Sequence, residues 1–139
     1  MVLIQDHKPL LIGQVTALSG VPIRTIRYYE SIGLLKSSGR TEGGFRQFSS
    51  DVFKRLSFIK RAQALGLSLQ EIGEILQVYD GGKPACNEIQ QKLKDKISEI
   101  DQQIEQFLTL RGELRELLLG WDSLTTKPED TICPNIQKD

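Results

Sequence analysis

The sequence predicts a mainly α-helical protein: four short N-terminal helices, a small two-stranded β-ribbon among them, and one long helix near the C-terminus. Three observations predict this fold class. Apolar residues recur at helical spacing, glycine-rich turns bracket one alternating segment, and a late stretch of about 34 residues has a single glycine and no proline. With 139 residues, 39% apolar and 26% charged, the chain suits one globular unit with an appended element.

Two short helices open the predicted fold. Residues 11–19 carry apolar side chains at positions 12, 15 and 18, which lie on one face of a helix, and Gly20 follows where that helix ends. Pro22 suits the first turn of a second helix. The inward face of the second helix is assigned to Ile23, Ile26 and Ile32. A tight connection between two such helices predicts a helix-turn-helix.

The β-ribbon is expected within residues 34–49. Ser-Ser-Gly and Gly-Gly give turn signals, and apolar and polar residues alternate around Phe45 to Phe48. We interpret this segment as a two-stranded wing. A third helix is expected from Asp51 to Ala64, with Ser50 as its N-cap and apolar positions 52, 56 and 59 turned inward.

A fourth helix and then the long helix complete the expected order. Ser68 and Glu71 fit the capping box S-x-x-E, which opens a helix through Tyr79. Asp-Gly-Gly-Lys-Pro then breaks the chain, and the long helix is expected from Cys86 to Leu119. We therefore divide the chain into a winged helix-turn-helix domain (residues 11–80), a dimerisation helix (86–119) and a C-terminal effector-binding tail (120–139).

The long helix requires a helical partner. One of its faces is charged, and the other carries apolar residues at alternating steps of three and four. Because no second long helix is expected in this chain, a second copy is the economical partner, which predicts a homodimer through a two-stranded coiled coil. The interface residues are Leu93, Ile97, Ile100, Ile104, Phe107, Leu114 and Leu118.

The composition favours a polyanion as partner and argues against an enzyme. Residues 1–79 hold 10 Lys and Arg against 6 Asp and Glu, whereas residues 80–139 hold 8 against 12. The single histidine, His7, supports neither a protease-like set nor a histidine metal site. No apolar run approaches the roughly 20 residues that cross a bilayer, and the start resembles no signal peptide. We expect a cytoplasmic protein without a membrane segment.

The second helix and the wing carry the residues expected to contact double-stranded DNA. Arg24, Arg27 and Tyr28 share the helix side opposite the inward isoleucines; Arg pairs with guanine or phosphate, and Tyr donates to phosphate. An isolated helix face of this kind is as often simply solvated, but a helix-turn-helix followed by a basic wing favours DNA. The further contact residues are Arg40, Phe45, Arg46 and Phe48 of the wing and, on the third helix, Lys60 or Arg61, with Lys54 and Arg55 as weaker candidates.

The run IGQVTALSGVPIRTIRYYESIGLL, the wing GRTEGGFRQFS and the segment ending LGLSLQEIGEIL together resemble the MerR family of bacterial transcription regulators. The resemblance implies promoter binding by the winged helix-turn-helix and an antiparallel coiled coil that joins two subunits. It also implies an effector site at the end of the coil, and activation by distortion of the promoter so that RNA polymerase can engage it. Phe45 and Phe48 stand where tyrosines are frequent in the family.

The two cysteines resemble those of the metal-sensing branch of this family. Cys86 opens the long helix, where backbone N–H groups favour a thiolate, and Cys133 lies in Ile-Cys-Pro-Asn-Ile. The resemblance implies that Cys86 of one chain meets the partner subunit's Cys133 around a thiophilic ion: Hg(II), Zn(II), Cd(II) or Pb(II). Trp121 replaces a further cysteine that is usual in the branch. Two thiolates satisfy Hg(II) in a line but do not close a tetrahedral zinc site, which slightly favours mercury.

The two cysteines and Trp121 are also compatible with roles that need no metal. The cysteines can be small buried residues without a ligand, or they can form an intersubunit disulfide that switches the dimer. An organic effector beside Trp121 is a further alternative. From a different functional class, the chain can be a constitutive DNA-binding coiled-coil protein without effector control.

Overall fold

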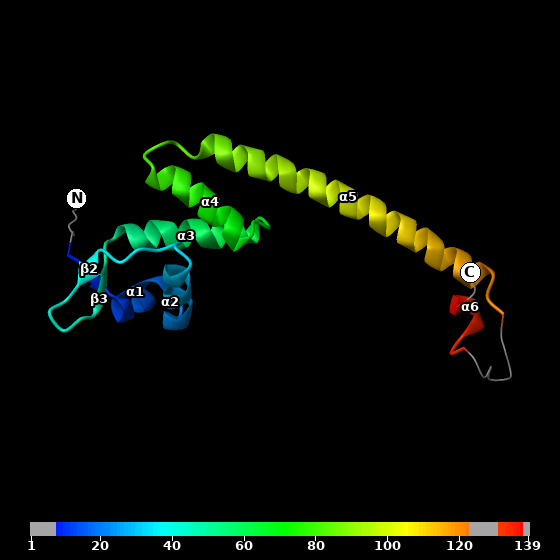
Figure 1. Ribbon diagram of the computed structural model, residues 1–139, viewed down its shortest axis with the longest axis horizontal. Helices are drawn as coiled ribbons and strands as arrows, with labels where there is room; N and C mark the ends of the chain where they lie inside the picture. Colours follow the sequence, from blue (N-terminus) through cyan, green and yellow to red (C-terminus); the bar gives the residue numbers. More distant parts are fainter. Residues whose placement is uncertain (1–7, 123–130, 138–139) are drawn as a thin grey trace. The chain divides into compact units, whose positions relative to one another are not determined.

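The structure, a computed structural model, describes residues 8–122 and 131–137. Its elements in chain order are β1 (Leu10–Leu11), α1 (Ile12–Ser19), α2 (Ile23–Ser31), β2 (Gly39–Arg40), β3 (Arg46–Phe48), α3 (Asp51–Ala64), α4 (Leu69–Asp80), α5 (Cys86–Leu119) and α6 (Pro134–Gln137) (Figure 1). The chain forms two compact units, Met1–Leu93 and Lys94–Asp139. The first unit contains the four short helices, the sheet and the first turns of α5. The predicted fold class, mainly helical with a wing and a long C-terminal helix, is confirmed.

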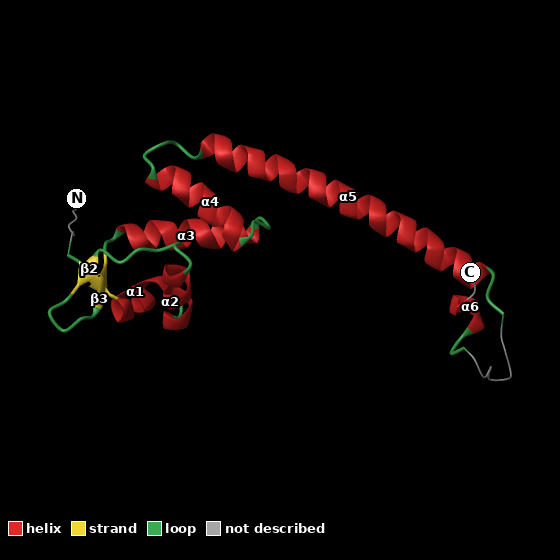
Figure 2. Ribbon diagram, in the orientation of Figure 1, coloured by secondary structure: helices red, strands yellow, loops and turns green. Residues whose placement is uncertain are grey.

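The wing contains one strand more than the sequence predicted. The sheet has three antiparallel strands in the order β1-β3-β2, and β1 pairs Leu10 with Phe48 and Leu11 with Gln47. Figure 2 shows β2 and β3 of this sheet in yellow. β1 escaped prediction because two residues are too few to show alternation, and Leu11 also serves as the N-cap of α1. The extra strand joins the wing directly to the first helix of the helix-turn-helix.

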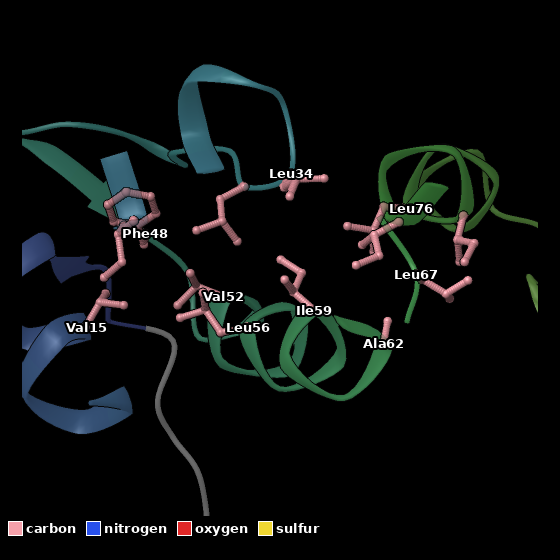
Figure 3. Packing of buried hydrophobic residues seen from close by; sticks show 13 residues of the cluster. Val15, Leu34, Phe48, Val52, Leu56, Ile59, Ala62, Leu67 and Leu76 are labelled. Atoms are coloured by element: carbon pink, nitrogen blue, oxygen red, sulfur yellow. The ribbon is translucent and has the colours of Figure 1, made fainter. Parts of the chain in front are cut away.

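The hydrophobic core lies in the first unit and is built along α3. Val52, Leu56 and Ile59 of α3 form its centre, as the sequence pattern predicted. Figure 3 shows Val15 and Phe48 at one end of the cluster and Leu67 and Leu76 at the other. One side chain of the second helix, Ile26, is fully buried, whereas Ile23 and Ile32 are 37% and 43% exposed. The inward assignment of those two isoleucines was wrong because the short α2 turns only one side toward the core.

The turns and caps follow local chemistry, with one exception. Gly20 ends α1 with φ 78°, a left-handed conformation that glycine adopts without strain. At α4 the predicted capping box is present: Ser68 Oγ accepts from the Glu71 N–H at 3.1 Å, and the Glu71 carboxylate accepts from the Ser68 N–H at 2.8 Å. Ser50 is not an N-cap of the expected kind, because its backbone is already helical and its side chain makes no cap hydrogen bond.

Helix α5 has the predicted bounds, and its first turns are fixed to α4. Lys92 pairs with Glu74 of α4 and, at 3.3 Å, with Glu88 one turn earlier. The hydrogen bond that Lys92 donates to Glu74 raises the pKa of Lys92 above its ordinary value. In the second unit most apolar residues of α5 are exposed in the single chain, from Leu108 at 45% to Leu119 at 88%. Among the described residues, none of the helices combines the length and apolarity that a membrane crossing requires.

Candidate nucleic-acid interface

Helix α2 turns its polar side away from the core. Arg24, Arg27 and Tyr28 are all exposed, Tyr28 at 53%, whereas Ile26 on the other side is fully buried. A single turn separates α1 from α2, so the position of this face is set by the same core that holds Val15. The structure therefore presents the three predicted contact residues together on one solvent-facing helix side.

The wing holds two arginines opposite each other. Arg40 of β2 and Arg46 of β3 are direct partners in the strand register. Each guanidinium has its own acceptor: Arg40 Nη1 donates to the Gly44 carbonyl at 2.8 Å, and Arg46 Nε lies 3.0 Å from Glu30 Oε1 on α2. Both arginines are thus oriented before any ligand binds.

These elements enclose a cleft between the wing and the helix-turn-helix. It has a volume of about 480 Å³ and is lined by Leu11, Ile12, Gly13, Gln14, Arg27, Arg40, Gly44, Phe45 and Arg46. Its positive charge comes from three arginines, two on the wing and one on α2. The first turn of α1 adds the positive end of a helix dipole, since Ile12 is the first helical residue. The charge and shape of the cleft suit a phosphate backbone.

The two wing phenylalanines have different positions. Phe45 is 69% exposed at the turn of the wing and lines the cleft. Phe48 has no exposed surface and packs in the core with Val15 (Figure 3). The prediction of Phe48 as a DNA contact was therefore wrong. The alternation within β3 points Phe48 to the opposite side of the strand from Gln47, which places it against the helices.

Among the basic residues of α3, exposure separates two groups. Lys54, Lys60 and Arg61 are exposed, but Arg55 is 7% exposed and is no candidate for a DNA contact. Its Nε donates to the Leu34 carbonyl at 2.9 Å. Its Nη1 and Nη2 bind the two carboxylate oxygens of Asp80 at 2.6 Å and 3.2 Å. This hydrogen bonding holds the pKa of the Asp80 carboxyl below its usual range.

The two cysteines lie in different units. Cys86 is the exposed first residue of α5, and Cys133 is half-buried immediately before α6; both thiols are free. The backbone N–H groups of Ile132 and Cys133 donate to Gln137 Oε1 at 2.6 Å and 3.0 Å. No group of three or more His, Cys, Asp and Glu side chains in residues 8–122 and 131–137 could hold a metal ion.

The Cys133 segment is tied to the end of α5. Asn135 is 4% exposed, and its amide forms two hydrogen bonds with the backbone of Asp122, at 3.1 Å and 3.0 Å. The same amide nitrogen lies 3.9 Å from Cys133 Sγ. Asn135 thus fixes the short α6 beside the residue that follows Trp121, and it orients the segment that carries the thiol.

Comparison with known proteins decides the family. Residues 11–48 match the description "MerR family regulatory protein", and residues 53–117 match "MerR, DNA binding". The mercuric resistance operon regulatory protein of Bacillus cereus is 39% identical over 106 residues, which cover 76% of this chain and 80% of that protein. The chain belongs to the MerR family.

Two further relatives extend the comparison. A probable heavy metal-dependent transcriptional regulator of Haemophilus influenzae is 34% identical over 104 residues, 75% of this MerR-family chain and 81% of that protein. The crystal structure of a transcription regulator from Ralstonia metallidurans in complex with lead(II) matches with a TM-score of 0.71 at 30% identity, covering 84% and 91% of the two chains. MerR-family proteins are DNA-binding transcription regulators and not enzymes, so this chain is a DNA-binding regulator.

Sequence reasoning missed two features of this MerR-family interface. Glu30 holds a wing arginine, and the only local signal for it is an acid one helical turn after Arg27, on the side that faces the wing. Arg55 gave no signal of burial, because its neighbours Lys54 and Lys60 are solvated basic residues on the same helix. Its partner Asp80 lies on a different helix, α4, so the periodicity of α3 does not relate the two residues.

Proposed function

We propose that this MerR-family regulator binds promoter DNA through one continuous face made by α2 and the wing. Arg24, Arg27 and Tyr28 enter the major groove, where arginine forks read guanine edges or hold phosphates. Arg40, Phe45 and Arg46 lie along the backbone, and Lys60 of α3 adds a phosphate contact. The observation that carries this proposal is the cleft lined by Arg27, Arg40 and Arg46.

The proposed active species is a homodimer joined through α5. The exposed apolar residues of the second unit must be buried against a partner. A helix whose apolar residues recur at alternating steps of three and four packs best against an identical helix. The proposed interface consists of Ile97, Ile100, Ile104, Phe107, Leu114 and Leu118 of this unit, together with Leu93, which is half-buried at the end of the first unit. In the antiparallel arrangement that the resemblance implies, the start of one α5 lies beside the end of the other, so Cys86 meets the partner subunit's Cys133.

The proposed effector is a thiophilic divalent metal ion. The names of two relatives refer to mercuric resistance and to heavy-metal dependence, and a similar structure holds lead(II). Within the described residues the donor set offers one thiol per unit, which suits an ion satisfied by two sulfur ligands. Hg(II) is therefore slightly favoured over Zn(II), Cd(II) and Pb(II), which need further oxygen donors such as Asp122.

In the proposed mechanism the metal acts by changing the shape of the bound promoter. The dimer has two arrangements of its coil ends, and an ion that binds one arrangement more tightly shifts the population toward it. The arms of the dimer then twist and bend the DNA so that RNA polymerase engages both promoter elements. Lys92 supports such a relay, because its pairs with Glu74 and Glu88 tie the Cys86 end of α5 to α4.

The decisive experiment for the effector is metal titration of the reduced full-length protein under competition. We expect one Hg(II) to bind tightly per thiolate pair, with binding lost in both Cys86→Ser and Cys133→Ser. Asp122→Asn is the matched control, because a two-coordinate ion does not need this oxygen donor. Binding that survives in Cys133→Ser refutes the proposed ligand pair.

The DNA face is tested by gel shift at moderate salt with a duplex selected by the wild-type chain from a random-sequence library. Arg27→Ala should weaken binding without changing the oligomeric state, because Arg27 is exposed on α2. Arg115→Ala, which removes an exposed arginine of α5, is the control outside the proposed face. Equal affinity of Arg27→Ala and wild type rejects the assignment of α2.

A second candidate effector is oxidation. Both cysteines are free thiols and Cys86 is exposed, so an antiparallel dimer offers two intersubunit disulfides in place of two metal sites. Non-reducing electrophoresis after mild oxidation separates the candidates. A covalent dimer that alters promoter shape without metal supports this alternative.

A further inference from the structure

We propose that Glu30 is a positioning residue for DNA binding, whose carboxylate fixes the guanidinium of Arg46 in the cleft. The inference rests on the proposed DNA face. Glu30 lies near the C-terminus of α2, and its Oε1 is 3.0 Å from Nε of Arg46 on β3. The ion pair therefore joins the helix with the proposed base contacts to the wing with the proposed backbone contacts.

The choice of atom matters for this role. The carboxylate forms its ion pair at Nε, and the Arg46 side chain makes no further ion pair with residues 8–122 or 131–137. Both Nη groups thus stay available in a cleft-lining side chain, and two Nη donors suit a phosphate. The ion pair at Nε already restricts the rotamers of Arg46 in the free protein. The side chain therefore loses less conformational entropy when it binds DNA.

The wing gives an independent reason for an anchor at this position. Arg40 and Arg46 are direct cross-strand partners, and like charges placed opposite each other destabilise a sheet. Each is held by a separate acceptor, the Gly44 carbonyl for Arg40 and Glu30 for Arg46. Without Glu30, repulsion from Arg40 would turn the flexible side chain of Arg46 out of the cleft toward bulk water.

The sign of the effect separates this role from simple electrostatics. Glu30 is the less exposed partner, with 17% of its side-chain surface accessible against 42% for Arg46. A carboxylate close to a phosphate backbone repels it, so removal of Glu30 would tighten DNA binding if charge alone counted. A positioning role predicts the opposite result.

The test measures affinity for the selected duplex across a salt series, with the full-length protein. Glu30→Ala should bind about two- to fivefold more weakly, the order of one partly exposed ion pair. Glu42→Ala is the matched control, because this exposed wing acid carries the same charge and should bind as tightly as wild type or tighter. Unchanged or tighter binding by Glu30→Ala overturns the proposal.

The same change made in the Arg46→Ala protein distinguishes the positioning role of Glu30 from a loss of folding. In the Arg46→Ala protein, the further change Glu30→Ala should cause no additional weakening, because its effect passes through the arginine. Weakening of equal size in both backgrounds indicates damage to α2 and overturns the positioning role.

The salt series also separates this inference from the function on which it rests. Arg46→Ala should lower the magnitude of the log–log salt slope by about 0.9, the value for one lost phosphate contact. If Arg24→Ala, Arg27→Ala and Arg46→Ala all leave affinity and slope unchanged, the proposed DNA face is wrong. If these variants lose affinity and Glu30→Ala does not, the DNA face stands and the role of Glu30 is rejected.

Discussion

Replacement of Arg55 by alanine should destabilise the first unit more than any change to its basic neighbours on α3. The side chain is 7% exposed and connects three parts of the unit. It donates to the Leu34 carbonyl between α2 and the wing, and it holds both carboxylate oxygens of Asp80 at the end of α4. The change Arg55→Ala removes all three hydrogen bonds at once.

The size of the loss follows from these contacts. A hydrogen bond to a charged group contributes about 1.5–3 kcal/mol, and a buried carbonyl left without its partner costs about 1 kcal/mol or more. Asp80 keeps 31% of its side-chain surface in water, so it is less costly to leave unpaired than a fully buried charge. We expect a total loss of about 3 kcal/mol, which lowers the melting temperature of a unit of this size by about 12 °C or more.

Thermal unfolding followed by circular dichroism at one fixed protein concentration measures this loss, because the stability of a dimer depends on concentration. Lys54→Ala is the control on the same helix. The Lys54 ammonium contacts Tyr79 and Asp51, but 68% of its side-chain surface is exposed and solvent screens such interactions. The melting midpoint of Lys54→Ala should therefore stay close to wild type. If Arg55→Ala melts at the same temperature as this control, the buried pair does not hold the unit together.

Three further outcomes are expected. The hydrogen bond that Arg55 donates lowers the pKa of Asp80 in the folded protein. The Asp80 carboxylate therefore stabilises the fold fully above the unfolded pKa of about 3.9. This stabilisation is lost as the pH falls through the lower folded pKa. Urea titration should therefore find a constant stability difference between wild type and Asp80→Asn at about pH 5 to 8 that shrinks below about pH 4. Phe48→Ala should cost about 3–5 kcal/mol of unfolding free energy, whereas Phe45→Ala should change it by less than about 0.5 kcal/mol and weaken DNA binding; equal costs in the same titration would contradict the assigned burial. Ser68→Ala should lose about 1 kcal/mol, and Ser50→Ala, which has no cap hydrogen bond to lose, serves as its comparison.

Local chemistry was enough to predict helices α1 to α5 and the two-stranded wing, but not the third strand β1 or the short helix α6. The bounds of α5 can be predicted because Pro84 precedes the helix and Gly120 follows it, and because apolar residues recur at helical spacing through its 34 residues. The capping box at Ser68 is equally local. β1 depends on a partner more than thirty residues away in the chain, so its two residues carry no pattern of their own. Its pairing is decided by tertiary structure.

The sequence predicted which residues belong to the candidate site, but it predicted much less of which residues their side chains contact. The exposed face of α2 follows from helical geometry, and the basic character of the wing follows from composition. The burial of Phe48 and the pairing of Arg46 with Glu30 depend on how the wing packs against α2, which periodicity within one element does not describe. Long-range pairs of this kind separate residues that bind a ligand from residues that hold others in place.

The pairing of β1 with β3 bears on how such regulators can be recombined. Because Leu10 and Leu11 bond to the last strand of the wing and run without a break into α1, residues 10–48 form one closed piece of chain whose two ends lie side by side. A chimaera that exchanges only α2 would place the helix of one regulator beside the wing of another, although these two elements did not evolve together. An exchange of residues 10–48 as a cassette carries the helix, the wing and their ion pair together, and leaves α3 as a common platform for different promoter specificities.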